Sequence, residues 1–283
     1  MTKLIALLAV LTSVAWGITA TASWIAKKKA PRAIAAGRTP ALPTTAEQDK
    51  AMLGAQLRTI AAIIFALVMF VALFRVSIGL SGQAGTAIAL TAGLSASGGL
   101  LLYSALPARK QTASRQPLVA GRAFILPAAS LLAFLSFLAT TALAPAFAEI
   151  HLDGVPLAVV AALFSGATAL AVHRLSTTLS LPDPRMAALD RSWRQLATRN
   201  LLQFAAGVLL AGLGGTAIMA GMELLKATGS TAAAHPGPDW AIAITAGGAG
   251  AAVTGVVLLI LAAKGTLTMR ATARDRDAAP ITA

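Results

Sequence analysis

The stretch LLQFAAGVLLAGLGGTAIMAGM, residues 201–222, decides the class of fold. None of its 22 residues carries a charge. An apolar helix of about 20 residues crosses the hydrocarbon core of a bilayer, which is about 30 Å thick. This stretch therefore predicts a transmembrane helix.

Six further apolar runs of comparable length occur elsewhere in the 283-residue chain. They cover residues 4–26, 59–80, 85–106, 123–147, 157–172 and 241–263. The composition agrees, because 57% of the residues are hydrophobic and only 12% are charged, whereas soluble proteins have about 25% charged residues. We therefore expect an all-α integral membrane protein, a bundle of seven transmembrane helices. This composition excludes a soluble enzyme and a free nucleic-acid binder.

The basic residues gather on alternate connections between these runs. Twenty Lys or Arg side chains follow the first, third, fifth and seventh runs, and the opposite side holds only Lys3, Arg75 and Lys226. Since Lys and Arg concentrate in cytoplasmic loops, we predict an outside N-terminus and a cytoplasmic C-terminus. The net charge of +13 then reflects orientation in a plasma (inner) membrane, and not nucleic-acid binding. Arginine outnumbers lysine 15 to 8, a usage typical of bacteria with GC-rich genomes.

The N-terminal segment has a second interpretation. Residues 1–23 also fit a secretory signal, because an apolar run is followed by the small residues Ala20 and Ala22. Cleavage after residue 22 would leave six spans and place all twenty clustered bases outside, against the positive-inside rule. A retained first helix explains the charges better.

Charge and hydropathy divide the chain into four parts. They are a first transmembrane helix (1–26), a basic cytoplasmic connection (27–58), a six-helix bundle of three hairpins (59–263) and a flexible cytoplasmic tail (264–283). Within the connection, Thr44 and Glu47 have the spacing of a capping box, in which each side chain accepts a hydrogen bond from the other residue's backbone amide. We therefore expect a helix to start there and run into the second span.

One cytoplasmic connection, residues 182–200, has an amphipathic pattern. Its apolar residues recur at three- and four-residue steps, and arginines occupy other positions. The apolar positions are Met186, Leu189, Trp193 and Leu196. Such a helix lies along the headgroups, with its tryptophan at the boundary, or docks a soluble partner such as an ATPase. The candidate residues for lipid or partner docking are Arg185, Arg191, Trp193, Arg194 and Arg199.

Small residues recur at four-residue spacing in several runs. In lipid, such stripes let helices approach closely. The candidate packing residues are Gly85, Ala89, Gly93, Ser97, Gly207, Ala211, Gly215, Gly247, Ala251 and Gly255. We expect these helices and the first one to form the centre of the bundle. The bulkier second and fourth runs are then expected to face lipid.

Residues for catalysis are scarce. The chain has no cysteine, which excludes thiol chemistry, and it shows no zinc-protease, nucleophile-elbow or phosphate-loop motif. Arg75 and Glu223, near the outer ends of two runs, can pair with each other or reach the headgroups. We therefore predict no catalytic, metal or cofactor site and no enzymatic activity.

These observations favour a membrane subunit of a transport or export system that works with a cytoplasmic partner. One alternative is a membrane scaffold, sensor or immunity protein that holds another membrane protein. A further alternative is an integral-membrane lipid enzyme, which would need the outer residues Glu149, His151 and Asp153 to be catalytic. The lipid bilayer is the one partner common to all three hypotheses.

Overall fold

The computed structural model describes residues 43–78, 84–106, 118–143, 154–181, 183–228 and 238–278. Over these residues the chain is helical, with six helices long and apolar enough to cross a membrane. These six correspond to the second to seventh predicted runs. The first predicted run, residues 4–26, and its interpretation as a signal both lie outside the described residues. The first span, and with it a total of seven, and the orientation therefore remain predictions from sequence.

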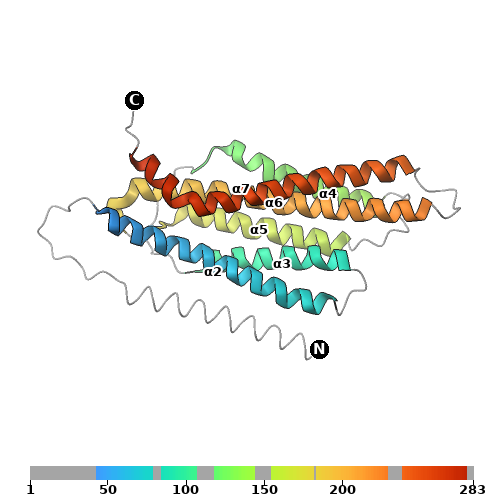
Figure 1. Ribbon diagram of the computed structural model, residues 1–283, viewed down its shortest axis with the longest axis horizontal. Coiled ribbons are helices and arrows are strands. Elements are labelled where there is room, and N and C mark those ends of the chain that lie inside the picture. The colour runs from blue at the N-terminus through green and yellow to red at the C-terminus, as the bar shows by residue number, and fades with distance from the viewer. Residues whose placement is uncertain are drawn as a thin grey trace, which may run out of the picture.

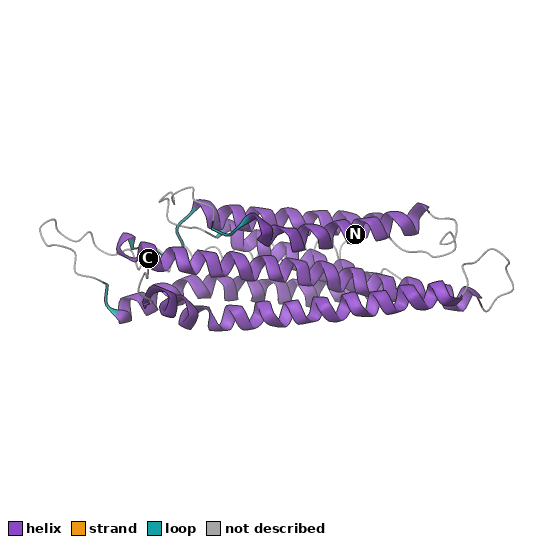
Figure 2. Ribbon diagram, turned by 90° about the horizontal axis from the view of Figure 1, so that it is seen from above, coloured by secondary structure: helices purple, strands orange, loops and turns teal. Residues whose placement is uncertain are grey.

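The six long helices lie roughly parallel to one another in both views of the molecule (Figures 1 and 2). They are α2 (Thr45–Ile78), α3 (Ala84–Ala105), α4 (Ile125–Leu143), α5 (Gly154–Thr177), α6 (Ala187–Thr228) and α7 (Pro238–Ala278). Short 3-10 helices, η1 (Gly121–Phe124) and η3 (Pro184–Met186), precede α4 and α6. Helices α6 and α7 form an antiparallel hairpin and pack against each other along their length.

The helices fall into two length classes. Helices α3, α4 and α5 have 22, 19 and 24 residues. A helix of this length is about as long as the hydrocarbon core is thick. Helices α2, α6 and α7 have 34, 42 and 41 residues, or about 50–60 Å at about 1.5 Å per residue. The long helices therefore continue beyond the apolar region.

The start of α2 confirms the predicted capping box. The backbone N–H of Thr44 donates to Glu47 Oε2 at 3.0 Å, and the backbone N–H of Glu47 donates to Thr44 Oγ1 at 3.4 Å. Because these two bonds satisfy amides that the first turn leaves free, the helix begins at Thr45 and runs unbroken into the span.

The centre of the apolar region is built around α6. A cluster of buried side chains from α4, α5 and α6 contains Phe134, Leu138, Leu157, Ala161, Phe164, Ala205 and Leu209. The rings of Phe164 and Phe204 meet edge to face, with their centroids 6.1 Å apart. In the apolar stretch of α6, 44% of the residues are buried. The corresponding shares for α2, α4 and α7 are 11%, 17% and 11%. Helices α2 and α4 are peripheral as expected, but α7 is peripheral too, against its predicted central place.

Glycines at seven-residue spacing join α6 to α7. Gly207, Gly214 and Gly221 on α6 face Gly255, Gly248 and Ala241 on α7. A Cβ atom added to Gly214 would lie 2.5 Å from the carbonyl oxygen of Gly248, and one added to Gly255 would lie 2.8 Å from that of Gly207. The two backbones therefore touch, and a seven-residue step up α6 matches a seven-residue step down α7, as in a coiled coil. We call this contact the glycine seam.

The seam corrects the predicted four-residue stripes. Gly207, Ala211 and Gly255 lie in it, but added Cβ atoms on Gly215 and Gly247 would meet no atom within 4 Å, and Ala251 is half-buried. The reason is geometric: four residues exceed one helical turn of 3.6 by about 40° of rotation. Residues at four-residue spacing therefore rotate progressively away from the face that contacts a neighbouring helix. Residues at seven-residue spacing stay close to that face.

The candidate packing residues of α3 face other neighbours. An added Cβ atom on Gly93 would collide with the Val160 side chain of α5. Ser97 is buried, and its hydroxyl donates to the Gly93 carbonyl oxygen at 2.6 Å. Ala89 packs beside the central cluster. Gly85 lies in α3, at a position for which only the backbone is described.

Candidate functional site: a basic helical platform

Three helices extend past the apolar region at the same end of the molecule. The extensions are residues 45–58 of α2, 187–200 of α6 and 265–278 of α7, each 14 residues long, or about 20 Å. In Figure 1 they lie at the left, where α2 and α6 begin and α7 ends. We call these three extensions the platform.

The platform has a hydrophobic core of its own. The core joins all three extensions to the connection between α5 and α6. It contains Met52, Ala55, Leu181, Met186, Leu189, Trp193, Leu196, Met269 and Ala273. Large apolar side chains from separate segments thus meet outside the apolar stretches, and their removal from water stabilises the assembly.

This core corrects the predicted interfacial helix. Trp193 is only 2% exposed and packs against protein rather than lying among lipid headgroups. The amphipathic segment forms the first turns of α6 and continues without a break into the sixth span. Its apolar face is covered because α2 and α7 both extend as helices beside it. The tail predicted to be flexible from residue 264 is likewise helical to Ala278.

A buried ion pair fixes the connection that leads into the platform. Asp190 and Arg194 are 1% and 4% exposed, and Arg194 Nε donates to Asp190 Oδ2 at 2.7 Å. Asp190 Oδ1 accepts the backbone N–H groups of Ser180 and Leu181, both at 2.8 Å. Arg194 Nη1 donates to the Leu175 carbonyl oxygen at 3.2 Å. Arg194 is therefore a buried structural residue and offers no surface for docking.

The other candidate docking arginines lie on the outside. Arg185, Arg191 and Arg199 are exposed. The guanidinium of Arg185 donates to the Asp183 carboxylate at 2.7 Å, and this hydrogen bond raises the pKa of Arg185. Arg185 therefore keeps its charge at any physiological pH.

A second ion-pair group links two of the extensions. Asp49 of α2 pairs with Arg270 of α7 at 3.4 Å and also with Arg274. The three extensions together carry eight Lys or Arg and five Asp or Glu residues. This excess of basic residues gives the platform a net positive charge.

A hydrogen bond between two helices caps the end of α3. Arg174, near the end of α5, donates from Nη2 to the carbonyl oxygen of Leu106, just after α3. A cation at this position neutralises the negative end of the helix dipole. The arginine that follows the fifth span thus has a structural role at the base of the platform.

The described residues contain no group of three or more metal-ligating side chains. The trio Glu149, His151 and Asp153 lies outside the described residues. Glu223, considered as a partner of Arg75, instead pairs with Lys226 at 2.7 Å, and both side chains of that pair are exposed.

Comparison of the chain with protein families, curated proteins and solved structures finds no match. The role of the platform therefore rests on its own geometry. Its burial and ion pairs show a preformed basic surface that projects from a multi-pass membrane protein.

Proposed function

We propose that the chain is the membrane subunit of a transport or export system and that a cytoplasmic partner docks on the platform. The observation that carries this proposal is the separate core of the platform. Anchoring in the membrane needs only basic residues near the span ends. Three helices that continue about 20 Å and share an interior beyond the apolar region instead hold a defined surface away from the membrane.

The partner surface is acidic. The platform presents exposed arginines, and complementary charge accelerates encounter and fixes the register of two surfaces. The docking residues are then Arg191 and Arg199 on the platform and Arg185 in η3, which leads into it. Trp193 and Arg194 support this face from inside, because both are buried.

Affinity purification tests the proposal. The tagged full chain is purified from its native membrane in mild detergent, and the accompanying proteins are identified by mass spectrometry. We expect stoichiometric recovery of a cytoplasmic protein such as an ATPase. The variant R185E/R191E should lose this protein while its own expression is kept and its stability falls by only about 0–1 kcal/mol, because the Arg185–Asp183 pair that it breaks lies at the surface.

A matched charge reversal at the opposite end provides the control. Arg75 and Lys226 are both exposed, and R75E/K226E changes the net charge by the same amount as R185E/R191E. The control should retain the partner. Equal loss in the two variants would show that total charge, and not the platform, governs recovery.

The remaining functional hypotheses predict different outcomes. A scaffold, sensor or immunity protein would be recovered alone or with another membrane protein only. A lipid enzyme would lose activity when Glu149, His151 and Asp153 are replaced by alanine. Loss of a transport phenotype together with loss of the cytoplasmic partner in R185E/R191E would exclude both alternatives.

A further inference from the structure

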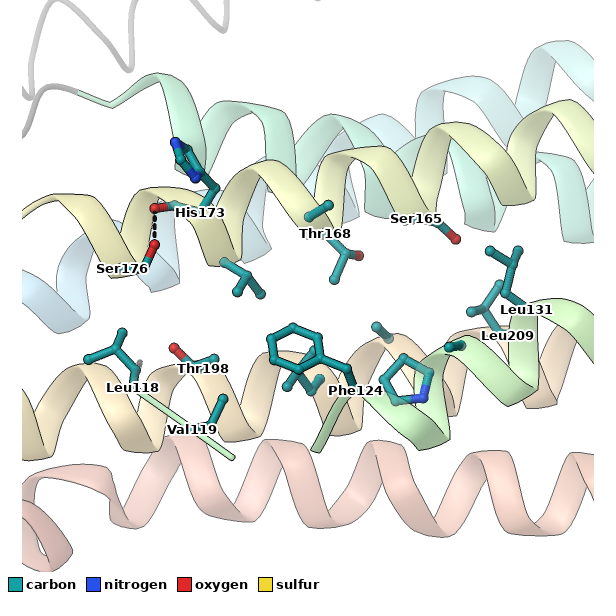
Figure 3. Close-up of a pocket in the computed structure, with 16 residues that line it drawn as sticks. Leu118, Val119, Phe124, Leu131, Ser165, Thr168, His173, Ser176, Thr198 and Leu209 are labelled. Atoms are coloured by element: carbon teal, nitrogen blue, oxygen red, sulfur yellow. Dashed lines mark hydrogen bonds between the residues drawn. The ribbon is translucent and has the colours of Figure 1, made fainter. Parts of the chain in front are cut away.

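A groove of about 480 Å³ opens on the side of the bundle between α4, α5 and α6 (Figure 3). Its volume is within the range of ligand sites, about 300–1,000 Å³. Most of its wall is apolar and includes Phe124, Leu131, Val172, Leu202 and Leu209. The groove does not involve the platform core.

The length and position of the groove match one leaflet of a bilayer. Its wall runs along α5 from Ser165 to Ser176 and along α6 from Thr198 to Leu209. Eleven helical steps correspond to about 16 Å, or half of the hydrocarbon thickness of about 30 Å. The groove begins beside the platform and ends in the apolar region, so it is parallel to the lipid chains of that leaflet.

Most hydroxyl groups in the wall are satisfied by their own helix. Ser165 donates to the Ala161 carbonyl oxygen at 2.8 Å, and Thr168 donates to that of Phe164 at 2.9 Å. Ser176 donates to the His173 carbonyl oxygen at 2.7 Å. These hydroxyls therefore present little polarity to a ligand, and the wall accepts a hydrocarbon chain.

Thr198 is the exception. This residue is 1% exposed, and its Oγ1 has no hydrogen-bond partner among the described residues. Figure 3 shows Thr198 on α6, facing the space between α6 and α5 at the platform end of the groove. A buried hydroxyl normally has a partner. The structure thus holds an unused donor at the end of the groove where a lipid ester would lie.

Two arginines adjoin residues of the groove wall in the sequence. Arg122 lies in η1, two residues before the lining residue Phe124, and Arg199 follows Thr198 directly. Both arginines are exposed. Basic residues at the headgroup level attract anionic lipids. The groove thus offers an apolar wall and one free hydroxyl donor, with arginines next to two of its lining residues in sequence, and these groups suit an acyl chain, its ester and an anionic headgroup.

We propose that this groove binds one acyl chain of an anionic phospholipid from the leaflet on the platform side. The chain occupies the apolar wall, and its ester carbonyl accepts a hydrogen bond from Thr198 Oγ1. Arg122 and Arg199 contact the phosphate. This lipid site shares Arg199 with the proposed docking surface but involves neither Arg185 nor Arg191, so the docking test with R185E/R191E and the lipid test can fail separately.

Native mass spectrometry of the purified full chain tests the proposal. The probes are phosphatidylglycerol and phosphatidylcholine with the same acyl chains, titrated in detergent. We expect one phosphatidylglycerol to bind with an affinity at least about tenfold above that for phosphatidylcholine, which corresponds to about 1.4 kcal/mol. Equal affinities would overturn the assignment of an anionic lipid.

Two variants separate the groove from the general lipid shell. Ala169 lines the groove and is exposed, so Ala169→Phe fills it without disturbing a buried residue. Ala243 is exposed on α7, and Ala243→Phe adds the same bulk elsewhere. Ala169→Phe should abolish the tight site and Ala243→Phe should retain it. Unchanged binding in Ala169→Phe would overturn the groove as the site.

A third variant tests the unused donor. Thr198→Val keeps the shape of the side chain and removes only the hydroxyl, so folding is preserved. We expect phosphatidylglycerol affinity to fall about two- to tenfold, the loss expected for one hydrogen bond. Arg122→Gln should reduce the preference for phosphatidylglycerol over phosphatidylcholine. Full affinity in Thr198→Val would show that the ester is not bound at this position.

Discussion

The two halves of the α6–α7 hairpin pack by different chemistry. In the apolar region, Gly214 and Gly248 bring the two backbones into contact. In the platform, Trp193 and Met269 belong to one core of large side chains. The same pair of helices is therefore joined by small residues in one half and by bulky residues in the other.

The difference follows from the solvent. Lipid gives apolar helices no hydrophobic reason to associate, so close backbone approach and dispersion provide the contact energy. Water outside the membrane drives large apolar side chains together. Asn200 marks the change, because its side chain packs on Gly265 and its Nδ2 lies 4.0 Å from the sulfur of Met269. The contact between α6 and α7 thus changes from large side chains to glycines within about two helical turns.

The largest effect is expected where the platform depends on a buried charge. Asp190→Ala leaves Arg194 buried without its carboxylate and frees two backbone amides. Breaking a buried pair in this way costs about 3–5 kcal/mol. We expect a large drop in the thermal stability of the purified chain, measured by fluorescence-detected size exclusion after heating. The double variant D190A/R194M should recover part of the loss, because no unpaired charge remains. Equal stability of wild type and Asp190→Ala would refute a structural role for this pair.

A smaller effect on stability is expected at two neighbouring glycines of α6, where the same substitution should act in opposite directions. Gly214→Ala places a methyl group against the α7 backbone, and overpacking of this kind costs about 1–3 kcal/mol. Gly215→Ala points to open space, where alanine is favoured over glycine by about 1 kcal/mol in a helix. Thermal unfolding of the two variants should therefore shift in opposite directions. A four-residue stripe would instead make Gly215→Ala the damaging change.

Hydropathy and charge were enough to predict the apolar helices of the described residues. The runs 59–80, 201–222 and 241–263 each fall largely or wholly within one helix, because an apolar run of this length is typical of a transmembrane helix. The start of α2 was predicted because the capping box is a local signal between Thr44 and Glu47. Features that depend on one helix or on adjacent residues were thus accessible.

The platform was missed because it depends on distant segments. Trp193 shows an amphipathic pattern, but the sequence does not say whether lipid or protein covers it. The answer lies in Met52 and Met269, which are far away in the chain. The glycine seam of the apolar region, by contrast, has a signal in the sequence: Gly207, Gly214 and Gly221 on one run and Gly248 and Gly255 on another repeat every seven residues. That period predicts a close contact between the two runs, whereas four-residue spacing included Gly215 and Gly247, which lie off it.

The smallest effect concerns the ion pairs at the platform surface. Asp49 pairs with Arg270 and Arg274 across α2 and α7, and its side chain is 38% exposed. Asp49→Asn should therefore lower stability by only about 0–1 kcal/mol, and salt should diminish the difference. Glu223→Gln at the opposite end removes an exposed pair within a single helix and serves as the control.

Thermal unfolding at low and high salt measures both variants. A loss for Asp49→Asn that persists in high salt would mean that this carboxylate is shielded from solvent, and the platform would then be held by charges at its surface as well as by its core. A loss that disappears in salt, with no change for Glu223→Gln, assigns the cohesion of the platform to Trp193 and its apolar neighbours. Arg270 and Arg274 then contribute charge to the platform surface but little to its stability, because removing the carboxylate that they share does not loosen the helices.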